Sequence, residues 1–294
     1  MMSEVVLGVI SGVFSALLWG FNPLIIKVIT KVESNPIIIT ALRQFWSGII
    51  AISLAISLSS FAPIELLPLI TLSAVLGPIV GDIGLTIAIR ELGSGLGTLL
   101  SYQYVIVAQL LAVIILSEPY TIGRLLATLS SMTALILVLS GDYLSGRRAL
   151  GVLGALVACL GWALATIINK IIQTSVDPLS FSITRTVMLL LVFGLPVTIM
   201  SKLFRNRENS LLSKNVKVHT LVALSGINGF ILAFILFLIA LNYVGVHGAT
   251  ILTAGSPVIT QLAARTITKE SITWRHFLSA TLIAIAALLI IVIK

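Results

Sequence analysis

The sequence predicts an all-α membrane protein with about ten transmembrane helices, and three observations predict it. The 294 residues are 58% hydrophobic and only 10% charged, with a mean hydropathy of +1.17, whereas a soluble domain carries about 25% charged residues. The apolar residues gather in runs of about 20, the length with which a helix crosses a bilayer. The first run also recurs at half the chain length, which indicates an internal repeat.

Composition also narrows the class of site and partner. A spanning β-barrel would alternate apolar and polar residues along each strand, and these runs do not. The net charge is +8, but the basic residues lie mostly in short segments between apolar runs, which fits membrane topology better than nucleic-acid binding. The single Cys159 excludes an internal disulfide and a cysteine metal site, and the three histidines form no HExxH motif. We therefore expect no metal, no cofactor and no nucleic-acid partner.

About ten apolar runs are long enough to cross a bilayer. The first is not a cleavable signal, because it is too long, has only Glu4 as a preceding charge, and recurs later in the chain. The longest polar loop between runs is 202–217. The expected spans are 5–29, 36–59, 65–89, 95–117, 121–140, 149–172, 178–201, 217–241, 246–267 and 272–293.

The second half of the chain repeats the first. The stretches Gly8 to Lys27 and Gly151 to Lys170 are both apolar, open with glycine, carry one tryptophan and end in lysine, with matching residues 143 positions apart. Further matches follow in the same order, and the offset grows by the extra length of the 202–217 loop. They pair Pro36 with Pro178, Arg43 with Arg185, Gly93 with Gly245, Gln109 with Gln261, and Glu118 with Glu270.

Each half therefore holds five expected spans, and we divide the chain into a first five-helix repeat, 1–145, and a second, 146–294. Because five is odd, the second half enters the membrane from the opposite side. Inverted repeats of this kind are common in secondary transporters, whose substrate site lies where the halves meet. Basic residues concentrate on the face opposite the termini, which by the positive-inside rule places the termini outside.

The first expected span has two distinct faces. One face is a smooth stripe of small residues spaced four positions apart, and small residues at this spacing let another helix approach closely. A neighbouring polar face includes Trp19 and Asn22, beside Pro23, which can loosen the helix. We interpret this face as a bendable stripe that lines a path; the alternative is that Trp19 packs and the polar groups bond locally. The smooth stripe consists of Gly8, Gly12, Ala16 and Gly20.

Asp82 lies well inside the third expected span, in the stretch VLGPIVGDIGL. Ionisable residues within a span are rare and are a functional hypothesis by default. The glycines and Pro78 around it allow the backbone to bend or to pack closely. We interpret Asp82 as a site for a cationic substrate group or a coupling proton; the alternative is a structural ion pair with Arg43 or another buried arginine. The matching position of the second half is Phe234, so such a site is asymmetric.

Two matched pairs of charged residues are interpreted as structural. Arg43 and Arg185 each lie about seven residues past the proline that starts a span, roughly 10 Å deep at 1.5 Å per residue. An arginine there can reach the headgroups or bond a neighbouring helix, and binding of an anionic substrate is the alternative. Glu118 and Glu270 close the fourth and ninth spans, where a carboxylate caps the next helix; proton coupling is the alternative.

Uncharged hydrogen-bonding side chains recur inside four later spans. They suit the orientation of an organic solute in a mostly apolar pocket, and they equally suit bonds between helices, worth about 1 kcal/mol or less each. We add them to Trp19, Asn22 and Asp82 as candidates for substrate binding in a cavity. The added candidates are Tyr102, Gln103, Trp162, Asn228, Thr253 and Gln261.

Each half has five expected spans, with a tryptophan late in its first helix, an arginine early in its second and a glutamate closing its fourth. This combination resembles the drug/metabolite transporter superfamily, in its ten-helix EamA branch. Pro257 and Glu270 are similar to that branch's proline–glutamate segment, whereas the first half has Val105 where the proline would fall. The resemblance covers almost the whole chain.

The resemblance implies a basket of ten helices around a central cavity, lined by the first, third, fourth, sixth, eighth and ninth spans. It also implies transport of small organic solutes, often export of amino acids or other metabolites. Termini in the cytoplasm are implied as well, in conflict with the count of basic residues, so the orientation stays open.

The working hypothesis is a secondary active transporter of the cell (plasma) membrane that exports small organic solutes by alternating access. The chain has no GxxxxGK[ST] motif for ATP, so a gradient is the expected energy source, with a proton as coupling ion and Asp82 as the coupling candidate. One alternative is a non-transporting membrane scaffold or lipid-binding protein. Another is a membrane-embedded enzyme, for which Asp82 lacks a partner group; we expect no enzyme. The expected partners are a solute and membrane lipid, and the sequence does not indicate an oligomeric state.

Overall fold

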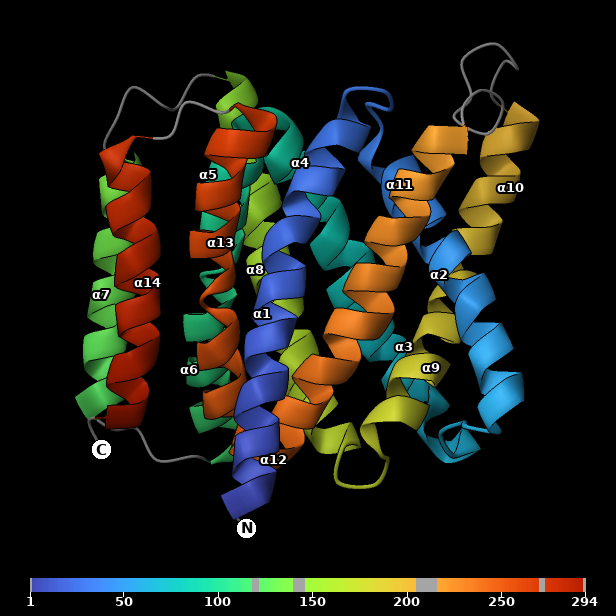
Figure 1. Cartoon of the computed structure of the whole chain (residues 1–294), viewed down its shortest axis with the longest axis horizontal. Helices are drawn as coiled ribbons and strands as arrows, with labels where there is room; N and C mark the ends of the chain where they lie inside the picture. The colour runs from blue at the N-terminus through green and yellow to red at the C-terminus, as the bar shows by residue number, and fades with distance from the viewer. Residues whose placement is uncertain (1, 118–121, 140–145, 205–215, 270–272, 293–294) are drawn as a thin grey trace.

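A computed structural model describes residues 2–117, 122–139, 146–204, 216–269 and 273–292, and within them the regular elements are helices (Figure 1). Among the described residues, seven helical stretches are long and apolar enough to cross a membrane by length and composition, so the chain is an integral multi-pass membrane protein. They are Ser3–Thr30, Pro36–Leu58, Ile64–Leu92, Ser94–Leu116, Arg148–Ile172, Pro178–Ser201 and Val216–Val246. Helices also occupy the other three expected spans, and the count of ten stays a prediction.

The described residues of the first half form five helical stretches, of which the third and fourth are interrupted. Their elements are α1 (Met2–Thr30), α2 (Pro36–Leu58), η1 (Ile64–Leu66), α3 (Leu67–Ala74), η2 (Val75–Gly81), α4 (Asp82–Leu92), α5 (Ser94–Ser101), α6 (Tyr104–Leu116) and α7 (Ile122–Leu139).

The second half follows the same plan. Its elements are α8 (Gly146–Ile172), α9 (Pro178–Leu189), η3 (Leu190–Gly194), α10 (Leu195–Phe204), α11 (Val216–Gly226), η6 (Ile227–Leu232), α12 (Ala233–Thr253), α13 (Ser256–Ala263), η7 (Ala264–Thr268) and α14 (Trp274–Val292).

The halves run in opposite directions. In Figure 1, α1 starts at the lower side of the bundle, whereas α8 starts at the upper side and runs down. The two halves also pack across one another: α1 packs on α12, α4 on α8, α2 on α9, and α7 on α14. The first span of each half thus packs against the third span of the other, which is the arrangement of an inverted repeat.

The smooth stripe predicted on α1 is confirmed as a helix-packing surface. A methyl group added at Gly8 would lie 2.8 Å from Cβ of Tyr243, and one added at Gly20 would lie 2.8 Å from Ile259. Backbone carbonyls on the same face accept bonds from the partner helix, with Ser256 donating to Ala16 at 2.9 Å. Small residues let α1 approach α12 and α13 this closely.

The second span starts in the same way in each half, because both sequences place a capping residue before proline. The Asn35 side chain accepts from the N–H of Ile37 at 3.0 Å, and Asp177 accepts from the N–H groups of Leu179 and Ser180 at 3.0 Å each. These side chains satisfy N–H groups that have no partner within the helix. Partial burial acts to raise the pKa of Asp177, but the hydrogen bonds that it accepts outweigh this effect and lower its pKa.

The third and eighth spans each contain a π-helical segment at the same place. η2 begins at Val75 and η6 at Ile227, which are 152 residues apart. Such turns disturb the regular ladder of backbone bonds, and side chains from neighbouring helices bond their carbonyls. Gln44 donates to the carbonyl of Pro78 at 2.8 Å, and Trp19 donates to that of Gly229 at 3.1 Å. Irregular backbone inside a membrane protein requires partners of this kind.

Gly93 and Gly245 are matched positions of the repeat, and the helix axis changes direction at both. Gly93 separates α4 from α5 with φ 92° and ψ 165°, and Gly245 kinks α12 with φ 72° and ψ −179°. Only glycine adopts this region of backbone space readily. The matched glycines therefore set the angle between the third and fourth spans of each half.

Replacing Gly245 by alanine is expected to lower the free energy of unfolding by about 1–3 kcal/mol, measured by denaturant or thermal unfolding in detergent. No atom lies within 4 Å of a Cβ added there, so the cost comes from the backbone alone. Gly255→Ala is the matched control, because Gly255 is helical, with φ −67° and ψ −22°, and an added Cβ meets its nearest atom at 3.4 Å. Wild-type stability of Gly245→Ala would contradict this account of the kink.

Candidate functional site

A cavity of about 90 Å³ lies between the two halves. Its wall includes backbone and side chains from the first, second, third, fourth, sixth, seventh and eighth spans. The first half contributes Trp19, Asn22, Pro23, Arg43, Gly77, Pro78, Asp82, Leu85, Tyr102 and Tyr104, and the second half contributes Trp162, Ala165, Thr166, Asn169, Arg185, Gly229, Phe230, Phe234 and Phe237.

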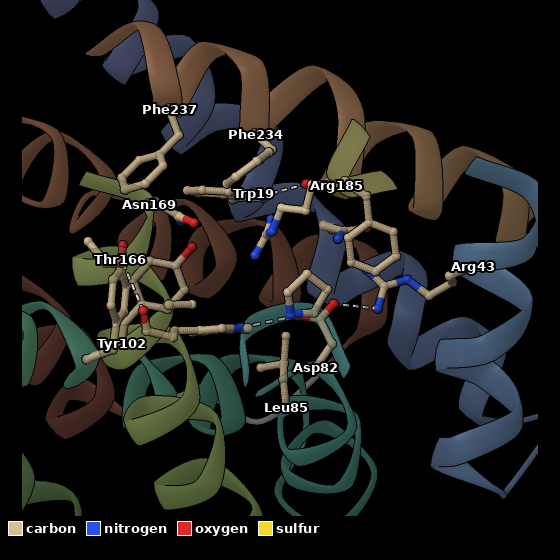
Figure 2. A pocket seen from close by; sticks show the side chains of 18 of the residues that line it. Trp19, Arg43, Asp82, Leu85, Tyr102, Thr166, Asn169, Arg185, Phe234 and Phe237 are labelled. Carbon is tan, nitrogen blue, oxygen red and sulfur yellow. Dashed lines mark hydrogen bonds and ion pairs between the residues drawn. The ribbon is translucent and has the colours of Figure 1, made fainter. Parts of the chain in front are cut away.

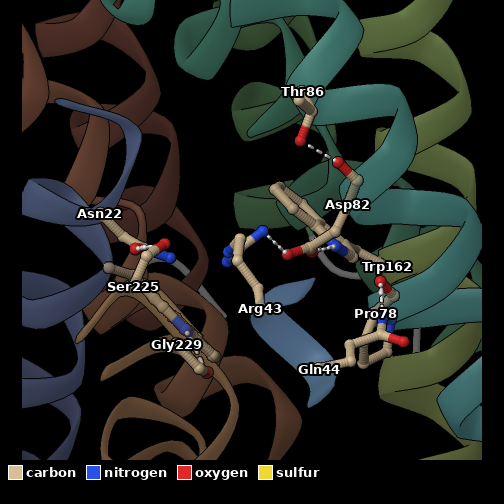
Figure 3. Close-up of polar contacts among 10 residues, drawn as sticks. Asn22, Arg43, Gln44, Pro78, Asp82, Thr86, Trp162, Ser225 and Gly229 are labelled. Carbon is tan, nitrogen blue, oxygen red and sulfur yellow. Dashed lines mark hydrogen bonds and ion pairs between the residues drawn. The ribbon is translucent and has the colours of Figure 1, made fainter. Parts of the chain in front are cut away.

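Asp82 is held at the floor of this cavity by two donors (Figures 2 and 3). Nη1 of Arg43 lies 2.9 Å from Oδ2 of Asp82, and Nε1 of Trp162 donates to Oδ1 at 3.2 Å. The Arg43 side chain has no exposed surface, and that of Asp82 is 11% exposed. The ion pair joins α2 to α4, and the Trp162 bond joins α4 to α8 of the other half. Asp82 therefore connects the halves.

The environment of Arg43 favours a fixed position. Its guanidinium carbon lies 4.7 Å from the centroid of the Phe230 ring, a cation–π contact. Arg43 thus makes an interhelical bond within the bundle, and the alternative in which it reaches the headgroups is contradicted by its complete burial. Asp82 thus pairs with Arg43, the residue that the sequence analysis named as its partner in the structural alternative.

Arg185, the repeat partner of Arg43, enters the cavity from the opposite half. Its guanidinium carbon lies 4.1 Å from the centroid of Phe234, the residue that replaces Asp82 in the repeat. Nη2 donates to the carbonyl of Ser73 at 3.3 Å. Among the described residues, no carboxylate lies within 4.0 Å of this guanidinium. The Figure 2 view shows its nitrogens directed into the open space above Asp82.

Aromatic rings form the remaining wall in two groups. Trp19 and Phe237 lie with ring centroids 5.2 Å apart, and Phe237 stacks on Phe234 at 6.5 Å. On the other side, Tyr102 contacts Trp162 edge to face at 5.8 Å. Such rings offer a large apolar surface for the body of an organic ligand.

Neutral polar groups at the wall are mostly paired within the protein. Asn169 accepts from the Ser73 hydroxyl at 2.5 Å, Asn22 accepts from Ser225 at 2.7 Å, and Thr166 donates to the carbonyl of Trp162 at 2.8 Å. These bonds fix the wall, because a buried polar group without a partner is costly.

Five of the nine cavity candidates from the sequence line this cavity, namely Trp19, Asn22, Asp82, Tyr102 and Trp162. Their contact with a solute stays a prediction.

The other four candidates lie outside the lining, and three of them bond neighbouring helices. Thr253 bonds the hydroxyl of Tyr104 at 2.9 Å, Gln261 donates to the carbonyl of Gly95 at 3.0 Å, and Asn228 donates to that of Leu18 at 2.8 Å. Gln103 lies at the junction of α5 and α6, outside the lining. Glu118 and Glu270, interpreted as caps, lie outside the described residues.

Sequence reasoning missed several lining residues. Thr166 and Asn169 follow Trp162 at the fourth and seventh positions on one face of α8, and this polar spacing is a signal that could have been used. Phe230, Phe234 and Phe237 carry no such signal, because a phenylalanine in a membrane helix faces lipid as readily as a cavity.

Within the described residues, no group of three or more histidine, cysteine or acidic side chains could hold a metal ion. The cavity offers a fixed carboxylate, two guanidinium groups and an aromatic wall. This chemistry is suited to binding and orienting a small organic molecule between two parts of a protein.

Comparison with known proteins agrees with this architecture. A family model for the EamA-like transporter family matches residues 6–140 and 149–292, once in each half. A crystal structure of a protein that is 14% identical aligns with 99% of this chain and 96% of its own, with a TM-score of 0.69, and so shares the fold. No curated protein matches the chain. The resemblance seen in the sequence is confirmed, and the chain belongs to the EamA-like transporter family.

Proposed function

We propose that this protein is a secondary active transporter that exports small organic solutes across the plasma membrane by alternating access. The two moving parts would be the halves 1–145 and 146–294. The observation that carries the proposal is the cavity between antiparallel halves, with a buried ion pair at its floor. Inverted repeats that enclose such a site rock around it to expose it to each side in turn.

Asp82 is the proposed coupling group. In the ionised form it bonds Arg43 from its own half and Trp162 from the other half. Protonation would remove the charge that holds Arg43 and weaken the bond from Trp162. The proton would thereby act on the contact between the halves, which is the contact that alternating access must break and remake.

A ligand screen followed by a flux measurement tests this function. The purified protein is first heated with amino acids, organic acids, sugars, nucleosides and amines, because a ligand that binds the folded form raises its melting temperature. We expect a stabilising ligand to exchange across proteoliposomes in counterflow at least about tenfold faster than across empty liposomes, a difference of about 1.4 kcal/mol in the barrier. A ligand that raises the melting temperature but is not exchanged would contradict transport.

A further inference from the structure

Arg185 is a charged group in the wall of the cavity, and no carboxylate of the described residues lies within 4.0 Å of its guanidinium. The residue is 5% exposed, and its Nε atom is buried without a hydrogen-bond partner. Within the described residues, its Nη2 donates to the carbonyl of Ser73 at 3.3 Å, and its guanidinium lies over the Phe234 ring. Arginine stays protonated in proteins, so the guanidinium brings to the wall a positive charge that no carboxylate of the described residues contacts directly.

The charges of the lining do not cancel. The wall includes two guanidinium groups, those of Arg43 and Arg185, and one carboxylate, that of Asp82. Both Asp82 oxygens already accept bonds, from Arg43 at 2.9 Å and from Trp162 at 3.2 Å. The described residues of the lining therefore carry a formal charge of +1. A charge buried without a partner is costly, and within a membrane span it indicates a functional contact.

The shape around Arg185 leaves the guanidinium accessible from the cavity. A methyl group added at Gly77 would lie 2.7 Å from Nη2 of Arg185 and 3.0 Å from Ala165, so glycine is what allows the group to lie there. The Phe234 ring supports one face of the guanidinium plane. A planar group held in this way is suited to bind both oxygens of a carboxylate.

We propose that the transported solute is an organic monoanion, whose carboxylate or equivalent oxyanion binds Arg185 and whose apolar body lies against Trp19, Phe234 and Phe237. This inference rests on the proposed function and narrows its substrate class. An added ammonium group would find no unengaged carboxylate in the described wall, so amines and zwitterions should bind less well than anions.

Equilibrium binding to the purified full-length protein tests the headgroup. The probes are 3-phenylpropanoate, its amide 3-phenylpropanamide, and L-phenylalanine, and the readout is intrinsic tryptophan fluorescence, because Trp19 and Trp162 line the cavity. A hydrogen bond to a charged group corresponds to roughly 10- to 100-fold in affinity. We expect 3-phenylpropanoate to bind at least about tenfold more tightly than either analogue. Equal affinity for the amide, or for L-phenylalanine, would overturn the inference.

Variants at two positions test the assignment to Arg185. Arg185→Gln is expected to weaken 3-phenylpropanoate binding by roughly 10- to 100-fold and to leave amide binding unchanged. Gly77→Ala keeps every charge but displaces the guanidinium, and we expect it to weaken the same ligand selectively. Arg275→Gln is the control, because Arg275 is exposed at the start of α14 and contacts the Trp274 ring.

Two further readouts separate a binding role from a structural one, and binding from transport. If Arg185 binds the ligand, the Arg185→Gln protein without ligand should melt at the wild-type temperature or higher, because the substitution removes a buried charge that no carboxylate of the described residues contacts directly. A lower melting temperature together with unchanged affinity would show a structural role and overturn the inference. Binding of 3-phenylpropanoate without counterflow would sustain the anion site and contradict transport. Counterflow of neutral or cationic solutes without preference for anions would sustain transport and overturn the anion site.

Discussion

Replacing Asp82 by asparagine is expected to abolish flux driven by a pH gradient and to lower the free energy of unfolding by about 3–5 kcal/mol. The side chain of Arg43 is completely buried, with the Asp82 carboxylate 2.9 Å away. Asparagine keeps the shape of the Asp82 side chain but leaves the Arg43 guanidinium without its carboxylate partner, and it cannot carry a coupling proton. The measurements are unfolding in detergent and pH-jump uptake into proteoliposomes of a solute that wild type transports, normalised to folded protein.

A double replacement separates stability from coupling. In Arg43→Met/Asp82→Leu both charges are removed together, and apolar replacement of a buried pair is often neutral or stabilising. We expect this variant to recover most of the lost stability and none of the pH-driven flux. Full pH-driven flux in Asp82→Asn would show that Asp82 has only a structural role, the alternative that the sequence left open.

Replacing Gly84 by valine is expected to prevent normal packing of α4 on α8, at a cost of about 3 kcal/mol. A Cβ at Gly84 would lie 2.5 Å from the carbonyl oxygen of Gly154 and 2.9 Å from the backbone nitrogen of Ala158. Both are backbone atoms of α8 and cannot move aside as a flexible side chain would. The helices would have to separate, and Trp162 would lose its bond to Asp82.

The unfolding midpoint and the yield of monodisperse protein measure this effect. Leu160→Val is the matched control, because it places the same β-branched residue on the exposed, apolar face of α8, where Leu160 is 54% exposed. The control should behave as wild type. A Gly84→Val protein that is as stable as the control would contradict the close crossing of α4 and α8.

The plan of the fold could be read from the sequence because its signals are local. The pairs Pro36 with Pro178 and Gly93 with Gly245 determine where helices begin and where they turn, and in the structure both members of each pair have the same backbone role. The π-helical segments were not predicted, because a widened turn has no residue pattern of its own.

The cavity was harder to predict, because it depends on which face of each helix turns inward. Thr253 and Gln261 are as polar as Asn22, yet they face the fourth span and bond it. Arg43 and Arg185 were interpreted as structural residues from their depth, and the structure places both in the lining. Helix rotation is set by packing between the halves, and residue type alone does not specify it.

Labelling of a single cysteine from each side of the membrane tests the central claim most directly. Cys159 is the sole native cysteine and is buried, so Cys159→Ala gives a background to which Thr166→Cys adds one thiol in the cavity wall. We predict that a membrane-impermeant thiol reagent labels this position from either face, and that reversing a gradient of the transported solute shifts labelling from one face to the other. Labelling from one face only, whatever the gradient, or from neither face, would contradict a cavity that opens alternately between two antiparallel halves.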